Sequence, residues 1–180
     1  YLTRPYKLVP LTAAALPEIS PDGRTWTIRI KPGVLFADDP AFKGRKRELT
    51  AHDYVFAWKR LLDPRMRAPM LWFLDGKIVG SDEVLAKAKK AGRLDYDAPM
   101  AGIEVVDRYT LRLRLNFPDT ELLANLTTSG FGAVAREVIE AYGDGSGWAM
   151  ANPVGTGPYR LKEWRRGQKI VLEANPNYRE

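Results

Sequence analysis

Residues 25–31, with the sequence TWTIRIK, decide the fold class of this chain. Their side chains alternate between polar and apolar, and this period is typical of a β-strand with one buried face. The turn-forming sequence Pro21-Asp22-Gly23 precedes the segment, and Pro32-Gly33 follows it. We therefore expect a half-buried strand that directs Trp26, Ile28 and Ile30 into a core.

A helix is expected after this strand, beginning at Thr50. Asp53 follows three residues later and completes a capping box with Thr50. Asp63-Pro64 ends the pattern, since proline cannot continue a helix. Apolar side chains recur between these limits at helical spacing, namely Tyr54, Trp58, Leu61 and Leu62. This spacing predicts that Trp58 is buried.

The remaining expected elements are short. They are helices over residues 81–91, 120–126 and 134–142, and hairpins that pair 103–106 with 109–115 and 159–164 with 169–173. Gly143 to Gly147 should form a loop at the edge of a subdomain. Strands and helices alternate without a regular βαβ repeat, so the pattern predicts an α+β fold with a mixed, largely antiparallel sheet and several short helices.

The composition indicates a globular chain and excludes several classes of site. The 180 residues are 45% hydrophobic and 28% charged, and no apolar run approaches the roughly 20 residues that a membrane-spanning helix needs. Cysteine is absent, which removes disulfides and thiolate chemistry. Residues 1–10 lack the apolar region of a signal peptide. We expect the chain to begin within a longer protein, or after processing.

Few residues suggest catalysis. His52 is the single histidine, so it has no second histidine or cysteine with which to bind a metal. Asp38 and Asp39 are adjacent and should point apart, while Ser129 and Ser146 lack the frame of a nucleophile elbow. We therefore expect no enzyme activity and no cofactor.

A basic run leaves an alternative open. Residues 43–47, KGRKR, place four cations within five positions, which would suit a nucleic-acid or anionic-surface binding module. The chain carries 28 cations and 22 anions spread along its length, and charge runs of this kind are usually solvated loops. We favour the loop, and expect no nucleic acid as a partner.

Two stretches resemble the family 5 extracellular solute-binding proteins, the oligopeptide, dipeptide and nickel binders of ABC importers. The first covers residues 22–36, 49–55 and 62–64. The second covers residues 152–159 and continues through Trp164, Gly167 and residues 175–178. One departure is the longer, basic stretch from Ala37 to Glu48, where the family commonly has a short turn. The resemblance implies that the chain is part of a two-lobe receptor and is not an enzyme.

The resemblance also implies a division of the chain and a set of site residues. Residues 1–150 would form the small α+β subdomain of the first lobe, of the class II periplasmic binding protein kind, and residues 151–180 a β-hairpin that starts the main-lobe segment. Met70 matches a position where some peptide-binding members carry a ligand-facing tyrosine. The ligand-contacting residues that the resemblance implies are Met70, Thr128, Ser129 and Phe131. Trp72 joins them as a candidate on its own residue type, because exposed aromatic side chains next to loops suit ligand contact.

The same resemblance implies the partners and the location. The ligand would be a peptide or another small solute, and the protein partner would be the membrane permease of an ABC importer. The receptor would be a monomer in the periplasm or exported to the cell surface, with its signal peptide outside these residues.

Overall fold

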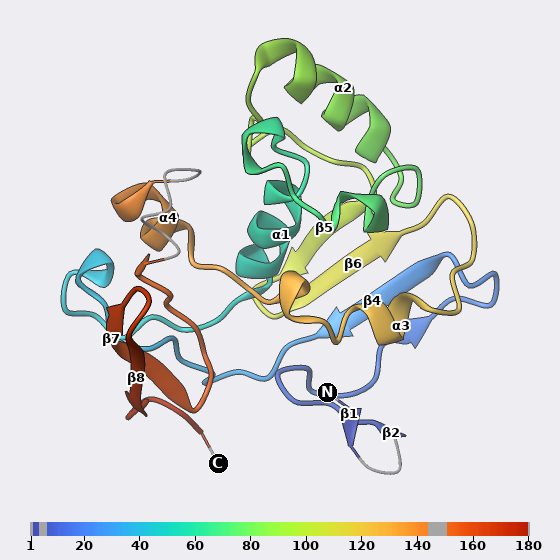
Figure 1. The fold of residues 1–180 in the computed structure, drawn as a ribbon. Helices are drawn as coiled ribbons and strands as arrows, with labels where there is room; N and C mark the ends of the chain where they lie inside the picture. Colours follow the sequence, from blue (N-terminus) through green and yellow to red (C-terminus); the bar gives the residue numbers. More distant parts are fainter. Residues whose placement is uncertain (1, 4–6, 144–150, 180) are drawn as a thin grey trace. The chain divides into compact units, whose positions relative to one another are not determined.

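The computed structural model describes residues 2–3, 7–143 and 151–179, and Figure 1 follows the course of the chain. The chain folds into two compact units. Unit 1 comprises Tyr1–Lys31 and Thr50–Gly132, and unit 2 comprises Pro32–Leu49 and Ala133–Glu180. The predicted division into residues 1–150 and 151–180 concerns the lobes of a larger protein, and it stays a prediction.

Unit 1 is built on a four-stranded antiparallel sheet in the order β3–β4–β6–β5 (Figure 1). Its strands are β3 (Glu18–Ile19), β4 (Thr25–Arg29), β5 (Ile103–Asp107) and β6 (Thr110–Arg114). Trp26 lies opposite Leu113 in the register of β4 and β6, and both side chains are buried. The strand predicted from TWTIRIK is therefore confirmed. A separate antiparallel pair joins β1 (Leu2–Thr3) to β2 (Lys7–Leu8).

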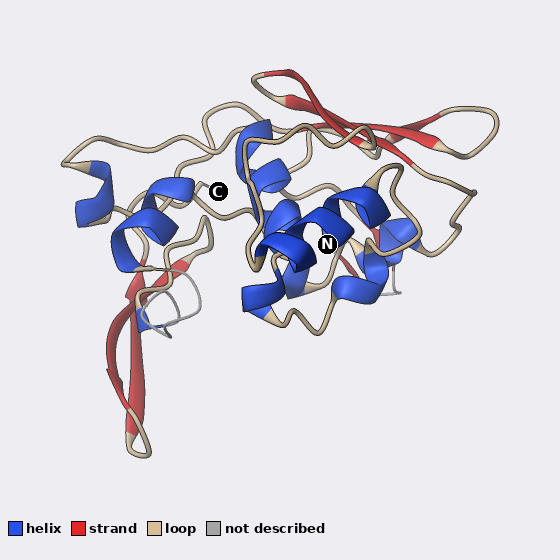
Figure 2. Cartoon of the chain, turned by 90° about the horizontal axis from the view of Figure 1, so that it is seen from above, coloured by secondary structure: helices blue, strands red, loops and turns tan. Residues whose placement is uncertain are grey.

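Helix α1 (Ala51–Arg60) packs against β5 and β6. Figure 2 shows the sheet of unit 1 nearly edge-on, with helices on one of its faces. The backbone N–H of Thr50 donates a 2.7 Å hydrogen bond to Asp53 Oδ2, which confirms the capping box. Trp58 is 3% exposed, as the helical spacing predicted. The buried face of α1 closes the core over the sheet.

The other helices occur where the sequence predicted them, with small shifts of their ends. α2 (Ser81–Ala91) is followed by Gly92, whose φ of 72° suits a glycine C-cap. α3 (Leu122–Asn125) and α4 (Arg136–Tyr142) both begin later than predicted. For α4 the reason is local, since Ala135 has extended backbone angles. The described residues also contain four single-turn 3-10 helices, namely η1 (Pro40–Phe42), η2 (Pro64–Met66), η3 (Leu71–Phe73) and η4 (Ser129–Phe131).

Unit 2 contains η1, α4 and the antiparallel hairpin of β7 (Tyr159–Arg165) and β8 (Lys169–Ala174). The turn includes Gly167 with a φ of 74°, a conformation that favours glycine. This hairpin confirms the second predicted hairpin. Of the loop predicted from Gly143 to Gly147, the structure describes only Gly143. The rest of that loop, which includes Ser146, lies outside the described residues. The architecture is the predicted mixture of antiparallel strands and short helices.

Candidate functional site

Two single-turn helices of unit 1, η3 and η4, lie side by side although they are far apart in sequence. The rings of Phe73 in η3 and Phe131 in η4 are 4.0 Å apart between centroids. Both side chains are buried. This aromatic contact brings four of the predicted ligand-contacting residues into one region, which we call the η3–η4 rim and define as Met70, Trp72, Thr128 and Ser129.

Met70 precedes η3 and its partly buried side chain lies against η4. A Cβ atom placed on Gly130 would approach Met70 Cγ to 3.1 Å, which is closer than nine in ten real Cβ contacts. The absence of a side chain at Gly130 therefore lets Met70 pack directly on the backbone of η4. A thioether in this place offers apolar, adaptable contact and no fixed donor.

Trp72 is the exposed aromatic of the rim, with 53% of its surface open to solvent. Its indole meets the ring of Phe73 nearly at a right angle, at 84° and 6.1 Å between centroids. The ammonium of Lys77 lies over the indole, 5.6 Å from its centroid. Large exposed aromatic side chains that are held in place suit ligand contact.

Thr128 and Ser129 are exposed and contribute hydroxyl groups. The Thr128 hydroxyl donates a 2.8 Å hydrogen bond to the Asn125 carbonyl oxygen, so its proton is committed to the protein. Within the described part of the chain, the Ser129 hydroxyl has no hydrogen-bond partner. Close by in sequence, the buried Asn125 Nδ2 also has no hydrogen-bond partner among the described residues. Ser129 can therefore donate to a bound molecule.

Phe131 has a different place from the other four. Its ring is 2% exposed, and its carbonyl oxygen accepts a 3.0 Å hydrogen bond from Trp58 Nε1. The residue therefore joins η4 to the core formed with α1. A direct role for Phe131 in ligand contact stays a prediction, as it does for the four residues of the rim.

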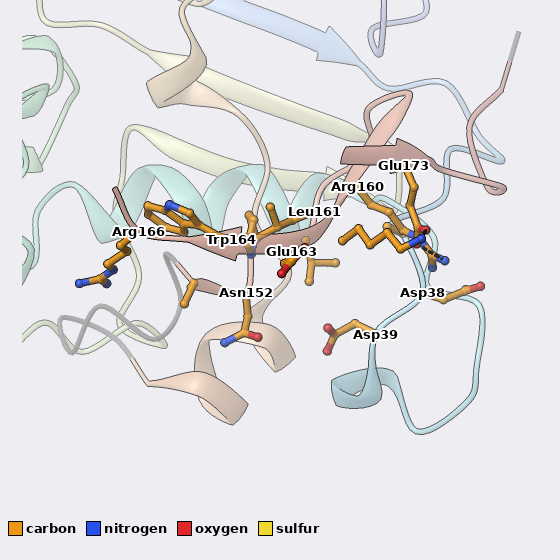
Figure 3. A pocket seen from close by; sticks show the side chains of 14 residues that line it. Asp38, Asp39, Asn152, Arg160, Leu161, Glu163, Trp164, Arg166 and Glu173 are labelled. Carbon is orange, nitrogen blue, oxygen red and sulfur yellow. Dashed lines mark hydrogen bonds and ion pairs between the residues drawn. The ribbon is translucent and has the colours of Figure 1, made fainter. Parts of the chain in front are cut away.

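Unit 2 has a separate polar pocket of about 380 Å³ between the hairpin and two other segments (Figure 3). Asp38 and Asp39 line it from one segment, and Ala151 to Val154 from the other. The hairpin contributes side chains of both charges. Most of the charges are already paired: Arg160 contacts Glu173 at 2.8 Å, and Glu163 pairs with Arg165 and Lys169. This internal pairing leaves little net charge to recruit an ionic ligand.

Asp38 and Asp39 have separate partners and do not converge on one point. Asp38 Oδ2 contacts Lys46 Nζ at 2.7 Å, and the hydrogen bonds from Lys46 and Asn177 lower the pKa of Asp38. Asp39 Oδ1 accepts from the Ala41 N–H at 2.8 Å and from the Tyr142 hydroxyl at 2.9 Å. They do not form an acid–base pair, which agrees with the sequence interpretation.

The basic run 43–47 is partly neutralised within unit 2. Lys46 pairs with Asp38, and Arg47 Nε contacts Glu137 Oε1 at 2.8 Å. Burial raises the pKa of Glu137, but the hydrogen bond from Arg47 outweighs this effect and the pKa is lowered. Two of the four cations therefore stabilise the fold, which weakens the case for a nucleic-acid surface.

The described residues offer no metal site and no membrane-spanning helix. His52 is exposed in the first turn of α1. In residues 2–3, 7–143 and 151–179, no group of His, Cys, Asp or Glu side chains is placed to bind a metal ion. No helix in the same ranges is both long and apolar enough to cross a bilayer.

Comparison with known proteins identifies the class. The family model for bacterial extracellular solute-binding proteins, family 5 Middle, matches residues 7–180. The chain belongs to this family, which confirms the resemblance found in the sequence. Proteins of this family bind solutes and are not enzymes, in agreement with the prediction of no enzyme activity.

Individual relatives support the assignment. The periplasmic oligopeptide-binding protein OppA of Salmonella typhimurium is 31% identical over 159 residues, which are 87% of this chain and 26% of that protein. The solved structure of Haemophilus influenzae OppA in complex with the peptide RPPGFSPFR is 30% identical, with a TM-score of 0.74 over 96% of this chain and 31% of the other. The pheromone receptor PrgZ shares the fold, with a TM-score of 0.78 at 24% identity over 98% of this chain and 32% of that one. The chain thus spans about a quarter of the length of the curated relatives it matches.

Two residues that support the rim were not found from the sequence. Lys77 contacts Asp119 at 2.8 Å, with side-chain exposures of 25% and 10%, and Lys77 also lies over Trp72. The two residues are far apart in sequence and belong to no recognisable motif. Only the pairing of residues 76–79 with the end of β6 brings them together.

Proposed function

We propose that residues 1–180 are part of the substrate-binding component of an ABC importer, a two-lobe receptor that binds peptides or similar small solutes. The observation that supports ligand contact by residues 1–180 is the exposed indole of Trp72, which is held in place by its neighbours. The η3–η4 rim contributes a few apolar contacts and the Ser129 hydroxyl, and the opposite lobe of the full-length receptor supplies most of the ligand's partners.

The similar proteins support this proposal. The relatives include oligopeptide-binding proteins, and one solved structure of a relative holds a nine-residue peptide. The named relative from Salmonella typhimurium is periplasmic. By analogy we assign the receptor to the periplasm or the cell surface, with the importer's membrane permease as its protein partner and with no cofactor.

The charge distribution of the rim favours a neutral or mixed ligand surface. Trp72 and Met70 are apolar, and Thr128 and Ser129 are uncharged. The nearby ammonium of Lys77 is already paired with Asp119. No charged group of the rim is therefore free to bind the ends of a peptide, and those ends must be bound elsewhere in the receptor.

The test is isothermal titration calorimetry of the full-length receptor with a library of short peptides that includes RPPGFSPFR. Trp72→Ala should weaken the binding of accepted ligands by about three- to tenfold, the usual effect of losing one aromatic contact. Leu16→Ala is the matched control, because Leu16 lies in the same unit outside the rim and is 54% exposed. Equal affinities for the wild type and Trp72→Ala would remove the rim from the binding site.

A further inference from the structure

We propose that Lys77 and Asp119 form a positioning pair that holds the Trp72 indole with one face free, and that this free face selects ligands with a neutral planar group such as an aromatic side chain. This inference rests on the proposed function, because it requires the rim to contact the ligand. Lys77, Asp119 and Trp72 would together give the receptor a preference for ligands with such a group.

The position of Lys77 is fixed by the backbone around it. The Asn116 N–H donates a 2.8 Å hydrogen bond to the Lys77 carbonyl oxygen, and Asn116 Nδ2 donates a 3.0 Å hydrogen bond to the Gly76 carbonyl oxygen. Ile78 and Leu115 form an isolated antiparallel bridge. Residues 76–78 are therefore held against the end of β6, and the start of the Lys77 side chain has little freedom.

The far end of the Lys77 side chain is fixed by Asp119. The ammonium is 2.8 Å from Asp119 Oδ2, while Asp119 Oδ1 accepts a 2.9 Å hydrogen bond from the Glu121 N–H just before α3. The carboxylate is thus shared between the lysine and the start of α3. Because α3 leads to Thr128 and η4, this ion pair joins the two halves of the rim.

Lys77 contacts two aromatic rings from this fixed position. Its ammonium lies 5.6 Å from the centroid of Trp72 and 5.9 Å from that of Phe73. Phe73 in turn packs on Phe131 in the core. The cation lies over the Trp72 indole, which also meets the Phe73 ring at an interplanar angle of 84°, yet 53% of the residue remains open to solvent. The open part is a flat apolar surface whose orientation is set before a ligand arrives.

The chemistry of this surface favours a neutral planar partner. Planar groups stack on indole with a gain beyond their buried area. A cationic ligand group would have to share the indole with the lysine that already lies over it, so the usual cation–π attraction is reduced. Since the Lys77 ammonium is paired with Asp119, it is also not free to bind a ligand carboxylate. Aromatic side chains suit this surface because they are planar and carry no charge.

The test compares two peptides, RPPGFSPFR and its analogue RPPGASPAR, by calorimetry on the full-length receptor. The wild type should prefer the phenylalanine peptide by about three- to tenfold. Lys77→Met keeps most of the side-chain volume but removes the cation, and should bring this ratio close to one. Lys77→Arg should retain the ratio, because a guanidinium can both stack and pair with a carboxylate. In a Trp72→Ala background, Lys77→Met should have no further effect on the ratio.

A second readout reports the position of Trp72 without a ligand. In receptor labelled with fluorotryptophan, the fluorine NMR signal that disappears in Trp72→Phe belongs to Trp72. This signal should shift and sharpen in Lys77→Met, as the ring gains freedom, and should stay near its wild-type position in Lys77→Arg. A purely structural role for the pair would lower stability without moving either the signal or the peptide ratio.

The outcomes separate the two levels of the proposal. If Trp72→Ala changes the peptide ratio but Lys77→Met changes neither the ratio nor the fluorine signal, the positioning role is overturned and the rim remains a ligand contact. If Trp72→Ala leaves binding of every accepted peptide unchanged, the proposed site itself is overturned. If the wild type shows no preference between the two peptides, including no binding of either, the aromatic selectivity is overturned.

Discussion

The indole Nε1 of Trp58 donates a 3.0 Å hydrogen bond to the carbonyl oxygen of Phe131. This contact ties helix α1 to η4, so the core of unit 1 directly supports the rim. The donor is buried and would lose this partner if η4 moved, which gives the contact a clear energetic cost when broken. The position of Thr128 and Ser129 therefore depends on a residue that no ligand would touch.

Replacement of Trp58 tests this support. Trp58→Ala should lower the free energy of unfolding by about 3 to 5 kcal/mol, because it empties a large buried aromatic site. Trp72→Ala is the control: because Trp72 is exposed, its replacement should lower the free energy of unfolding by less than about 1 kcal/mol. Denaturant unfolding followed by circular dichroism measures both values. Similar losses for the two variants would contradict the burial of Trp58.

Gly102 marks a close approach of two backbone segments. A Cβ atom at this position would lie 2.5 Å from the Val79 carbonyl oxygen and 2.6 Å from the Val79 nitrogen. Gly102→Ala should therefore destabilise unit 1 by about 1 to 3 kcal/mol through overpacking. Gly155→Ala is the matched change, because nothing lies within 4 Å of a Cβ atom there. Thermal unfolding in which the two variants behave alike would count against the close packing of residues 78–79 on Gly102.

The buried carboxylate of Asp63 predicts a pH dependence of stability. Its side chain is 0% exposed and contacts Arg65 at 2.6 Å, and the Tyr96 hydroxyl donates a 2.9 Å hydrogen bond to Asp63 Oδ2. Burial raises the pKa of Asp63, but the hydrogen bonds from Arg65 and Tyr96 outweigh it and the pKa is lowered from 3.8. A lowered pKa in the folded state stabilises the fold above the unfolded pKa, and this stabilisation is lost as the pH falls through the folded value.

Asp63→Asn should accordingly lower the free energy of unfolding by about 1 to 3 kcal/mol near neutral pH. The cost should shrink on acidification below about pH 4, where the wild type begins to lose the same contribution. Glu140→Gln is the control, because the Glu140 side chain is 62% exposed and its pair with Arg136 contributes little. Urea unfolding across the acid range provides the measurement. A cost for Asp63→Asn that stays constant down to the lowest pH would show that its charge is not the stabilising feature.

The basic run gives a prediction about nucleic acids. Lys46 and Arg47 are engaged in ion pairs inside unit 2, which leaves Lys43 and Arg45 as the more available cations. Because we expect the run to be a solvated loop and not a binding site, the salt concentration that elutes the protein from heparin should change little in the double variant Lys43→Gln and Arg45→Gln. A large drop in that concentration would favour the anionic-surface hypothesis.

The sequence predicted the elements of unit 1 from local patterns, whereas the contacts between distant residues have no such pattern. Alternation in residues 25–31 and the capping box at Thr50 are local signals, because each depends on residues only a few positions apart. The strand and helix they predict are both present. Lys77 and Asp119 form a non-local contact, created by the pairing of residues 76–79 with β6, and no local pattern encodes it. The contact of Phe131 with Phe73 is equally non-local, since it joins residues 58 positions apart in the core.

The most direct test of the account compares peptide binding by residues 1–180 with binding by the full-length receptor, using calorimetry and one peptide library that includes RPPGFSPFR. The rim offers apolar contact and a serine hydroxyl, and a ligand on it remains open to water on the other side, whereas lobe closure would exclude that water. We predict that the full-length receptor binds its ligands well and that residues 1–180 bind them weakly or not at all. Equal affinity of residues 1–180 and the full-length receptor would contradict the account, because this part would then contain the main binding site.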